Sequence, residues 1–446
     1  MAKKLTILGA GLSGLATGFY VKNTCPDLEI SILEKNAYPG GVIQTHRYDG
    51  FVFERGPRGI RPSGKGASFL TFAQELGLVD RIIPASQNAS IRYLYLYGRL
   101  RKLSLLTLLG SPLGHGIIST LIKEWLRKPE PSGPDESVQD FFTRHIGARL
   151  TTYLIDPFVT GTWAGDPSQL GINSTFPTLA EHARQSGSLL RGWAKKKPAP
   201  EFRDIEKSPL VTLQGGMNTL IQTVADQLSS CIQYNTTIQT IKPENTGFSI
   251  QTDTGTLTTD YILSTIPAPA IASILSEHPP ELTSLLKQIR YAPIITVSLG
   301  FEAAINPYPG FGYLVPSSEN QPVLGVIFND QTFPGQTRNH ATNLTVMMGG
   351  AKQPQLLSLS EAELTDLAIQ TVKEHLKIKK EPIYTKLEKI PHALPQYGLN
   401  HQALIDRIQN LCPKGLQIGG NVQGGVSIPD IITTARKTAQ RFTITG

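Results

Sequence analysis

Three glycines near the N-terminus have the spacing of a dinucleotide-binding turn. Gly9, Gly11 and Gly14 form a GxGxxG pattern between an apolar run and an amphipathic segment. In such a turn the first glycine permits the bend, the second lets a pyrophosphate approach the backbone, and the third lets helix and strand pack closely. Glu34, which follows Gly14 by twenty residues, can accept hydrogen bonds from ribose hydroxyls. We expect a dinucleotide site here, with a purely structural glycine turn as the alternative.

The surrounding pattern predicts the elements that position this turn. An apolar run over residues 4–9, an amphipathic segment over 12–23 and a second run over 29–34 predict a strand, a helix and a strand. Such a βαβ unit starts a parallel sheet, and the helix N-terminus offers free N–H groups to phosphates. Further strands are expected at 260–267 and 416–420, with a helix over 430–442. The fold class is therefore α/β, with a discontinuous Rossmann-like domain built from the start, middle and end of the chain.

The intervening segments predict two further regions. Residues 95–200 are helix-like and basic, with a Pro-rich loop at 129–134, whereas residues 291–350 hold several strand-like runs. We expect a mixed-sheet substrate domain and an inserted helical region. The expected division is 1–62, 206–268 and 411–446 for the nucleotide-binding domain, 63–98 and 269–410 for the substrate domain, and 99–205 for the helical insertion.

Several segments outside the glycine turn resemble a known family. Residues 34–45, with a double glycine ending at Gly41, resemble the extension that flavin oxidoreductases of the amine-oxidase type place after the second strand. Residues 54–62 and 311–318 closely resemble the protoporphyrinogen oxidase family, and residues 92–95 and 345–350 fit the same pattern. The resemblance covers essentially the whole chain. It implies FAD as cofactor and oxidation of a porphyrinogen to its porphyrin in haem biosynthesis, with O2 as acceptor and hydrogen peroxide as product.

The resemblance also implies a set of site residues. Arg92 matches the family arginine that pairs with a substrate propionate, and four positions match the lining of the ring pocket: Phe311, Gly312, Leu314 and Met347. The implied FAD contacts are Gly9, Ala10, Gly11, Leu12, Ser13, Gly14, Glu34, Lys35, Gly41, Val42, Gly56, Pro57, Arg58, Gly59, Ile232, Val426, Ser427 and Ile428. No catalytic acid or base is expected, because the flavin itself accepts hydride.

Some of these residues could have a purely structural or surface role instead. Arg92 could be a solvated surface arginine, and Leu314 and Met347 could be ordinary core residues. Arg58 either supports the cofactor or braces its own loop. The C-terminal turn departs from some relatives at Gln423 and Gly424, so the flavin contacts there are carried over as backbone contacts.

Other functions on the same scaffold stay open. Coproporphyrinogen is the rival substrate, and the sequence does not show whether additional cations such as Arg47 or Arg61 reach the pocket. An amine oxidase or a carotenoid desaturase is a rival enzyme class. A lipid-binding chaperone that has lost its flavin is a rival without catalysis, against which the intact glycines and Glu34 argue.

Composition limits the partners. The net charge of +7 and the pI near 9.1 suit an anionic surface, but we find no nucleic-acid motif and no metal-ligand pattern, and the three cysteines are widely spaced. The N-terminus lacks a signal-peptide pattern, so a cytoplasmic location is expected. Residues 99–128 place cations around an apolar run, which favours either an anionic membrane surface or inward packing beside the site. A homodimer is kept open.

Overall fold

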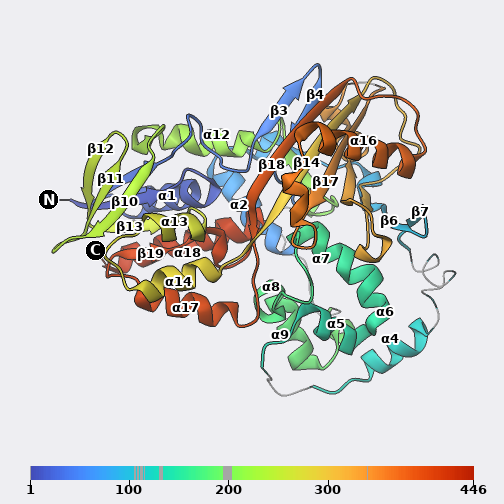
Figure 1. The fold of residues 1–446 in the computed structure, drawn as a ribbon, viewed down its shortest axis with the longest axis horizontal. Helices are drawn as coiled ribbons and strands as arrows, with labels where there is room; N and C mark the ends of the chain where they lie inside the picture. The colour runs from blue at the N-terminus through green and yellow to red at the C-terminus, as the bar shows by residue number, and fades with distance from the viewer. Residues whose placement is uncertain are drawn as a thin grey trace.

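The computed structural model describes residues 2–104, 107, 110, 114, 116–129, 134–193, 203–338 and 340–445. Figure 1 shows three regions: a parallel sheet with its helices beside the two termini, a larger twisted sheet at the opposite end, and a group of helices below that larger sheet. The chain passes between the first two regions several times. The α/β class predicted from the sequence is confirmed.

Five strands of the described chain form the parallel sheet, in the order β19-β13-β1-β2-β9. Leu5 of the central strand pairs with Ile30 on one side and with Tyr261 on the other. Apolar runs form these strands because both faces of a parallel sheet are covered. The strands are β1 (Lys3–Leu8), β2 (Leu28–Leu33), β9 (Ile232–Gln233), β13 (Tyr261–Ser264) and β19 (Leu416–Ile418).

Helices cover both faces of this sheet. One face packs against α1 (Leu12–Thr24), α2 (Ala67–Glu75), α12 (Asn218–Gln227) and α18 (Ile428–Thr445). The other packs against α13 (Ala268–Ile274), α14 (Pro280–Gln288), α17 (His401–Leu411) and the hairpin sheet β10 (Ile238–Pro243), β11 (Phe248–Thr252) and β12 (Gly255–Thr259). The sequence predicts a domain boundary after residue 62, but the apolar face of α2 joins the nucleotide-domain core through Phe69 and Phe72. α14 and α17, expected in the substrate domain, join the opposite face in the same way.

The larger sheet runs in the order β18-β14-β17-β16-β15-β6-β7. Its strands are β6 (Arg92–Leu96), β7 (Arg99–Lys102), β14 (Tyr291–Phe301), β15 (Gly312–Leu314), β16 (Val323–Phe328), β17 (Thr342–Gly349) and β18 (Tyr384–Pro395). Only the β15–β6 pairing is parallel within this described sheet. The helix α16 (Glu361–Leu376), which begins with a capping box of Ser360 and Glu363, packs on one face. The structure also has two smaller antiparallel pairs: β3 (Thr45–Tyr48) with β4 (Phe51–Glu54), and β5 (Ile82–Pro84) with β8 (Val211–Leu213).

The expected helical insertion is present but begins later than predicted. Residues 99–102 form β7, because Tyr97 and Gly98 both have positive φ and turn the chain into a hairpin with β6. The helices are α4 (Ile117–Trp125), α5 (Val138–Ile146), α6 (Ala148–Leu150), a π-helical turn at Thr151–Ile155, α7 (Asp156–Trp163), α8 (Ile172–Thr175), α9 (Pro177–Ser186), α10 (Leu189–Trp193) and α11 (Arg203–Glu206). Among the helices that the structure describes, none has the length and apolar character needed to cross a bilayer.

Candidate functional site

The turn between β1 and α1 has the shape that the glycine spacing predicts. Gly9 has a φ of +96°, and its N–H donates to the carbonyl oxygen of Leu33 at 2.8 Å. α1 begins directly after Gly11, and no side chain of the described residues caps its N-terminus. The first N–H groups of the helix can therefore bind an anionic group at the helix end.

The double glycine forms a second wall of this space. The N–H of Gly40 donates to the carbonyl oxygen of Ala10 at 2.8 Å, and Gly40 pairs with Gly11 in an isolated bridge. Gly41 has a φ of +59°, and a Cβ at that position would lie 3.5 Å from the Cα of Gly11. The extension after β2 therefore brings bare backbone against the glycine turn, as expected.

The carboxylate of Glu34 lies buried beside the same turn. One oxygen accepts a hydrogen bond from the N–H of Ala10 at 2.9 Å, and the other accepts from the N–H of Asn36 at 2.9 Å. The oxygen bound to the Asn36 N–H also accepts from the side-chain Nδ2 of Asn36 at 2.7 Å. The oxygen that faces Ala10 keeps a second lone pair, so it can still accept from a ribose hydroxyl. Ile232 lies one strand further out, paired with Ile32, while the side chains of Lys35 and Val42 are exposed.

A buried carboxyl group and a half-buried guanidinium lie where the loop after β4 meets this cradle. Glu54 accepts hydrogen bonds from the N–H of Met217 and the hydroxyl of Thr45, both at 2.8 Å, and burial raises the pKa of its carboxyl to about 7. Arg58 donates to the backbone oxygen of Glu54 at 3.2 Å, and burial lowers its pKa to about 10 against the opposing effect of Glu54. Gly56 packs on Val42, where a Cβ would lie 2.7 Å from the carbonyl oxygen. The loop predicted to approach the cofactor, with Pro57 and Gly59, is thus fixed to the second wall.

These residues fit a bound dinucleotide. The Nε of Arg58 is buried and has no hydrogen-bond partner among the described residues. A buried donor without a partner is costly, and an acceptor supplied by a ligand would satisfy it. Together with the uncapped helix and the bare backbone at Gly11 and Gly41, this donor suits a ligand with both phosphates and ring acceptors. The arrangement favours Arg58 as a cofactor contact over a simple loop brace.

The C-terminal turn completes the cradle through its backbone. The side chain of Val426 packs against the helical insertion and that of Ile428 against the nucleotide-domain core, so neither side chain is available to contact a ligand. The Ser427 hydroxyl accepts from the N–H of Asp430 at 3.3 Å and caps α18. Two hydrogen bonds from Tyr397 stabilise the turn: its hydroxyl donates to the carbonyl oxygen of Asn421 and accepts from the N–H of Gly425. Backbone contacts are thus the ones that Val426, Ser427 and Ile428 can offer.

Four of the predicted substrate residues share one face of the larger sheet. In register, Gly312 lies opposite Arg92, and Leu314 lies opposite Leu94. On the other side Leu314 faces Gly325, which in turn faces Met347. Residues directly opposite each other point to the same face of a sheet, so this face carries one cation and a row of apolar side chains.

Phe311 and Arg92 meet at the edge of that face. The guanidinium of Arg92 lies 4.3 Å from the centroid of the Phe311 ring. Arg92 is exposed at this edge, and partial desolvation, followed by the positive charge of Arg61, lowers its pKa. Arg47 instead donates to the backbone oxygen of Gly215 at 2.7 Å. Of the three arginines considered from the sequence, Arg92 and Arg61 therefore place their positive charges in one region, and Arg47 does not.

The helical insertion covers the apolar part of this face. Leu314 packs with Leu94 and Leu96 against Tyr153 and Leu154 of the π-helical turn. Gly161 on α7 makes room for Leu314, because a Cβ there would lie 2.5 Å from a Leu314 methyl carbon. These contacts come from residues 151–163, so they do not decide between the two alternatives expected for residues 99–128.

Three buried residues were not predicted from the sequence: Glu54, Tyr397 and His375 on α16. Glu54 ends an otherwise apolar strand, which is a signal for a buried carboxylate. Its partner Thr45 faces it across the β3–β4 hairpin, but Met217 comes from a distant segment. Nothing local marks Tyr397 or His375, because their partners are set by the tertiary fold.

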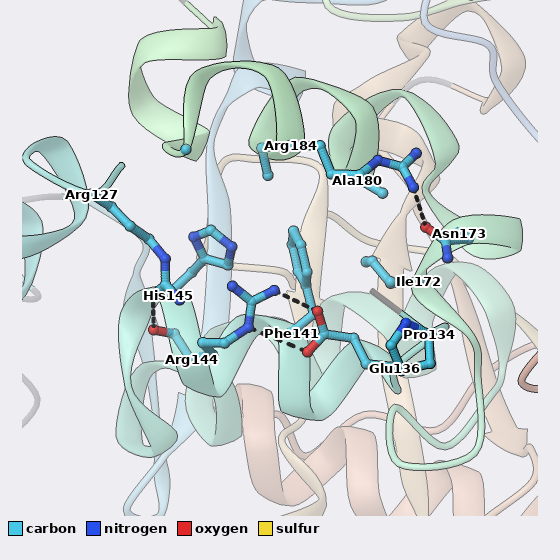
Figure 2. Close-up of a pocket in the computed structure, with 12 residues that line it drawn as sticks. Arg127, Pro134, Glu136, Phe141, Arg144, His145, Ile172, Asn173, Ala180 and Arg184 are labelled. Carbon is cyan, nitrogen blue, oxygen red and sulfur yellow. Dashed lines mark hydrogen bonds and ion pairs between the residues drawn. The ribbon is translucent and has the colours of Figure 1, made fainter. Parts of the chain in front are cut away.

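A separate hollow lies within the helical insertion. This cavity, of about 270 Å³, lies between α5 and α9. Figure 2 shows its lining, where Arg144 pairs with Glu136 and Arg184 donates to Asn173. Its lining includes none of the sequence-predicted site residues. Its lining mixes charged side chains with apolar ones such as Phe141 and Ile172. The described parts of the chain contain no group of three or more potential metal ligands.

Comparisons with known proteins agree with this geometry. The model of the family described as flavin-containing amine oxidoreductase matches residues 12–442. The protoporphyrinogen oxidase of cattle (Bos taurus) is 30% identical, with 99% of this chain and 98% of that protein covered. The coproporphyrinogen III oxidase of Bacillus subtilis is 26% identical, with 96% of each covered. A solved structure from Exiguobacterium, of a candidate protoporphyrinogen oxidase, aligns over 100% of both chains with a TM-score of 0.87 and 23% identity.

Proposed function

Because this chain belongs to the family of flavin-containing amine oxidoreductases, we propose that it oxidises protoporphyrinogen to protoporphyrin, with O2 as acceptor. A flavin carried in a dinucleotide cradle is FAD, so the chain is an FAD-dependent oxidoreductase. When bound, FAD supplies the acceptor for hydride from the substrate. The residues of the chain then have to hold a large apolar ring by its edge and keep water from it.

The single observation that carries the substrate assignment is the sheet face around Arg92. A porphyrinogen is an apolar ring system with carboxylate side chains, so its site needs apolar walls and a cation at the edge. Arg92 supplies the cation, and the half-buried Leu314 and Met347 supply an apolar wall on the same face. An amine substrate would be repelled by the charges of Arg92 and Arg61, which argues against an amine oxidase.

The choice between the two porphyrinogens depends on where the cations are. Protoporphyrinogen carries its propionates on one edge of the ring, whereas coproporphyrinogen carries them around it. Arg61 and Arg92 act on one region, and Arg47 is engaged with Gly215 elsewhere. This one-sided arrangement supports protoporphyrinogen. Coproporphyrinogen is the second candidate, because the Bacillus subtilis relative has that activity by name.

The test is turnover by the purified flavoprotein under air. The protein should show flavin absorbance, and porphyrin fluorescence should rise faster with protoporphyrinogen than with coproporphyrinogen, with peroxide released as O2 is consumed. A reversed preference would replace the substrate and keep the enzyme class. A colourless protein would favour the chaperone alternative, and a yellow protein inert towards both porphyrinogens would reject the proposal.

We also propose a peripheral site on an anionic membrane, on its cytoplasmic side. Four large apolar side chains on one helix and its end are exposed: Ile118, Ile122, Trp125 and Leu126. They recur at helical spacing, next to Lys123 and Lys128, which is the pattern of a helix lying in a bilayer interface. Part of the apolar run expected to share this role, at 105, 106, 108 and 109, lies outside the described residues.

A further inference from the structure

A buried histidine lies directly behind the strands that carry the substrate residues. His375, near the end of α16, is only 2% exposed. Its Nδ1 is 2.9 Å from the hydroxyl oxygen of Tyr313, and its ring stacks on Tyr95 with 3.7 Å between centroids and 20° between planes. The two tyrosines belong to β15 and β6, so one imidazole contacts both strands.

Alternation along each strand connects this contact to the substrate face. Tyr313 stands between Gly312 and Leu314, and Tyr95 follows Leu94. Successive side chains of a strand point to opposite faces, so the tyrosines point towards α16 while their neighbours point to the substrate face. The observed cores agree, since Tyr95 and Tyr313 pack with α16, and Leu94 and Leu314 pack with the helical insertion.

The hydrogen bonds assign the donor and acceptor roles of the imidazole. The Nε2 of His375 lies 3.2 Å from the side-chain oxygen of Gln321, which can only accept, so Nε2 carries the proton. Nδ1 then accepts from the hydroxyl of Tyr313. Burial lowers the pKa of His375 to about 4, which keeps the ring neutral and the two bonds in this direction at neutral pH.

We propose that His375 is a positioning residue, which fixes Tyr313 and Tyr95 and thereby sets where Leu314 and Arg92 meet the substrate ring. The inference rests on the proposed function, because it assumes that the ring lies on this face of the sheet. The cause is mechanical: β15 is a short strand at Gly312–Leu314, and it has a glycine at its start and another, Gly325, opposite its end. A short, glycine-flanked strand has few side chains to hold it, so its anchor is the tyrosine in its middle.

A positioning role differs from a merely structural role in what it changes. If His375 acts through Tyr313, loss of the hydrogen bond shifts the strand and weakens substrate binding, while flavin binding and the chemical step are kept. If His375 only adds stability, any destabilising change on α16 should have the same effect. Val372→Ala is the matched control, since Val372 is fully buried on α16 and carries no hydrogen-bonding group.

The experiment compares KM, kcat and flavin content for porphyrinogen oxidation. His375→Phe should raise KM about tenfold with kcat and flavin content unchanged. The phenyl ring keeps an aromatic side chain against Tyr95, but it cannot accept the hydrogen bond from Tyr313. His375→Asn places an oxygen near the position of Nδ1 and should recover most of the wild-type KM. Tyr313→Phe should raise KM like His375→Phe, and the double variant should be no worse than either single variant.

Two results would overturn the proposal. One is an unchanged KM in both His375→Phe and Tyr313→Phe, and the other is an equal rise in KM in Val372→Ala. Should His375→Phe fail to fold, Tyr313→Phe and His375→Asn carry the comparison. If the proposed function is wrong, the wild-type protein itself will form no porphyrin. Protoporphyrin binding, measured by fluorescence quenching, would then still rank the variants.

Discussion

The backbone of Gly9 leaves no room for a side chain at Gly14. A Cβ at Gly14 would lie 2.0 Å from the carbonyl oxygen of Gly9, where the end of β1 meets α1. At Gly11, by contrast, no heavy atom of the described residues lies within 4 Å of the position that a Cβ would take. The same motif therefore contains one glycine required by packing and one whose side-chain position is open to a ligand.

This difference predicts two separable phenotypes. Gly11→Val should leave the fold intact but remove bound FAD, because its side chain occupies the path of the pyrophosphate. Gly14→Ala should destabilise the protein by about 3 kcal/mol, the upper end of the usual cost of overpacking. Flavin absorbance per protein, circular dichroism and urea unfolding of both variants separate the two effects. Normal flavin content in Gly11→Val would remove the turn from the cofactor site.

Arg92 provides the second prediction. Arg92→Ala should raise the KM for porphyrinogen about tenfold or more, as expected for loss of a hydrogen bond to a charged group, and should leave flavin content unchanged. Arg61→Ala should act in the same direction because both charges face one region. Arg47→Ala is the control, since its guanidinium is bound to the backbone of Gly215. If Arg47→Ala has the larger effect on KM, the cation assignment is wrong.

The exposed face of α4 gives a third prediction. Trp125→Ser combined with Leu126→Ser should reduce flotation with vesicles that contain anionic lipid, because these side chains are 51% and 69% exposed on the proposed interfacial face. Phe158→Ser is the control, as Phe158 is a 46% exposed aromatic on α7. Wild-type protein that stays unbound at low salt, or equal loss in the control variant, would reject the membrane proposal.

The amount that could be predicted from the sequence differs between the two sites. The glycine turn and Glu34 were predictable because their function depends on local backbone shape and on a fixed spacing within one βαβ unit. The sheet face around Arg92 combines β6, β15, β16 and β17, and no local pattern shows that Arg92 lies opposite Gly312. That grouping came from the family resemblance. Glu54 and His375 were missed because burial, which gives them their properties, is decided by segments far away in the chain.

Glu54 supports a prediction on pH. The folded-state pKa of its carboxyl, about 7, lies above the ordinary value of 4.5, so this group stabilises the fold at low pH and loses that contribution as pH rises from 4.5 through 7. The loss should be about 2–3 kcal/mol. Glu54→Gln stays neutral, so its free energy of unfolding relative to wild type should rise across this window. Urea unfolding at several pH values measures the difference, and a constant difference would contradict the assignment.

His375 should show the opposite dependence. Its folded-state pKa, about 4, lies below the ordinary value of 6.5, so the neutral ring stabilises the fold above pH 6.5 and this contribution is lost as pH falls from 6.5 through 4. Between pH 4.5 and 6.5 the contributions of Glu54 and His375 therefore change in opposite directions and partly cancel in the wild-type protein. His375→Asn cannot be protonated in this range, so its deficit in unfolding free energy relative to wild type should shrink by about 2–3 kcal/mol as pH is lowered. A deficit that stays the same at pH 4 and pH 7 would mean that His375 is protonated as easily in the folded as in the unfolded chain.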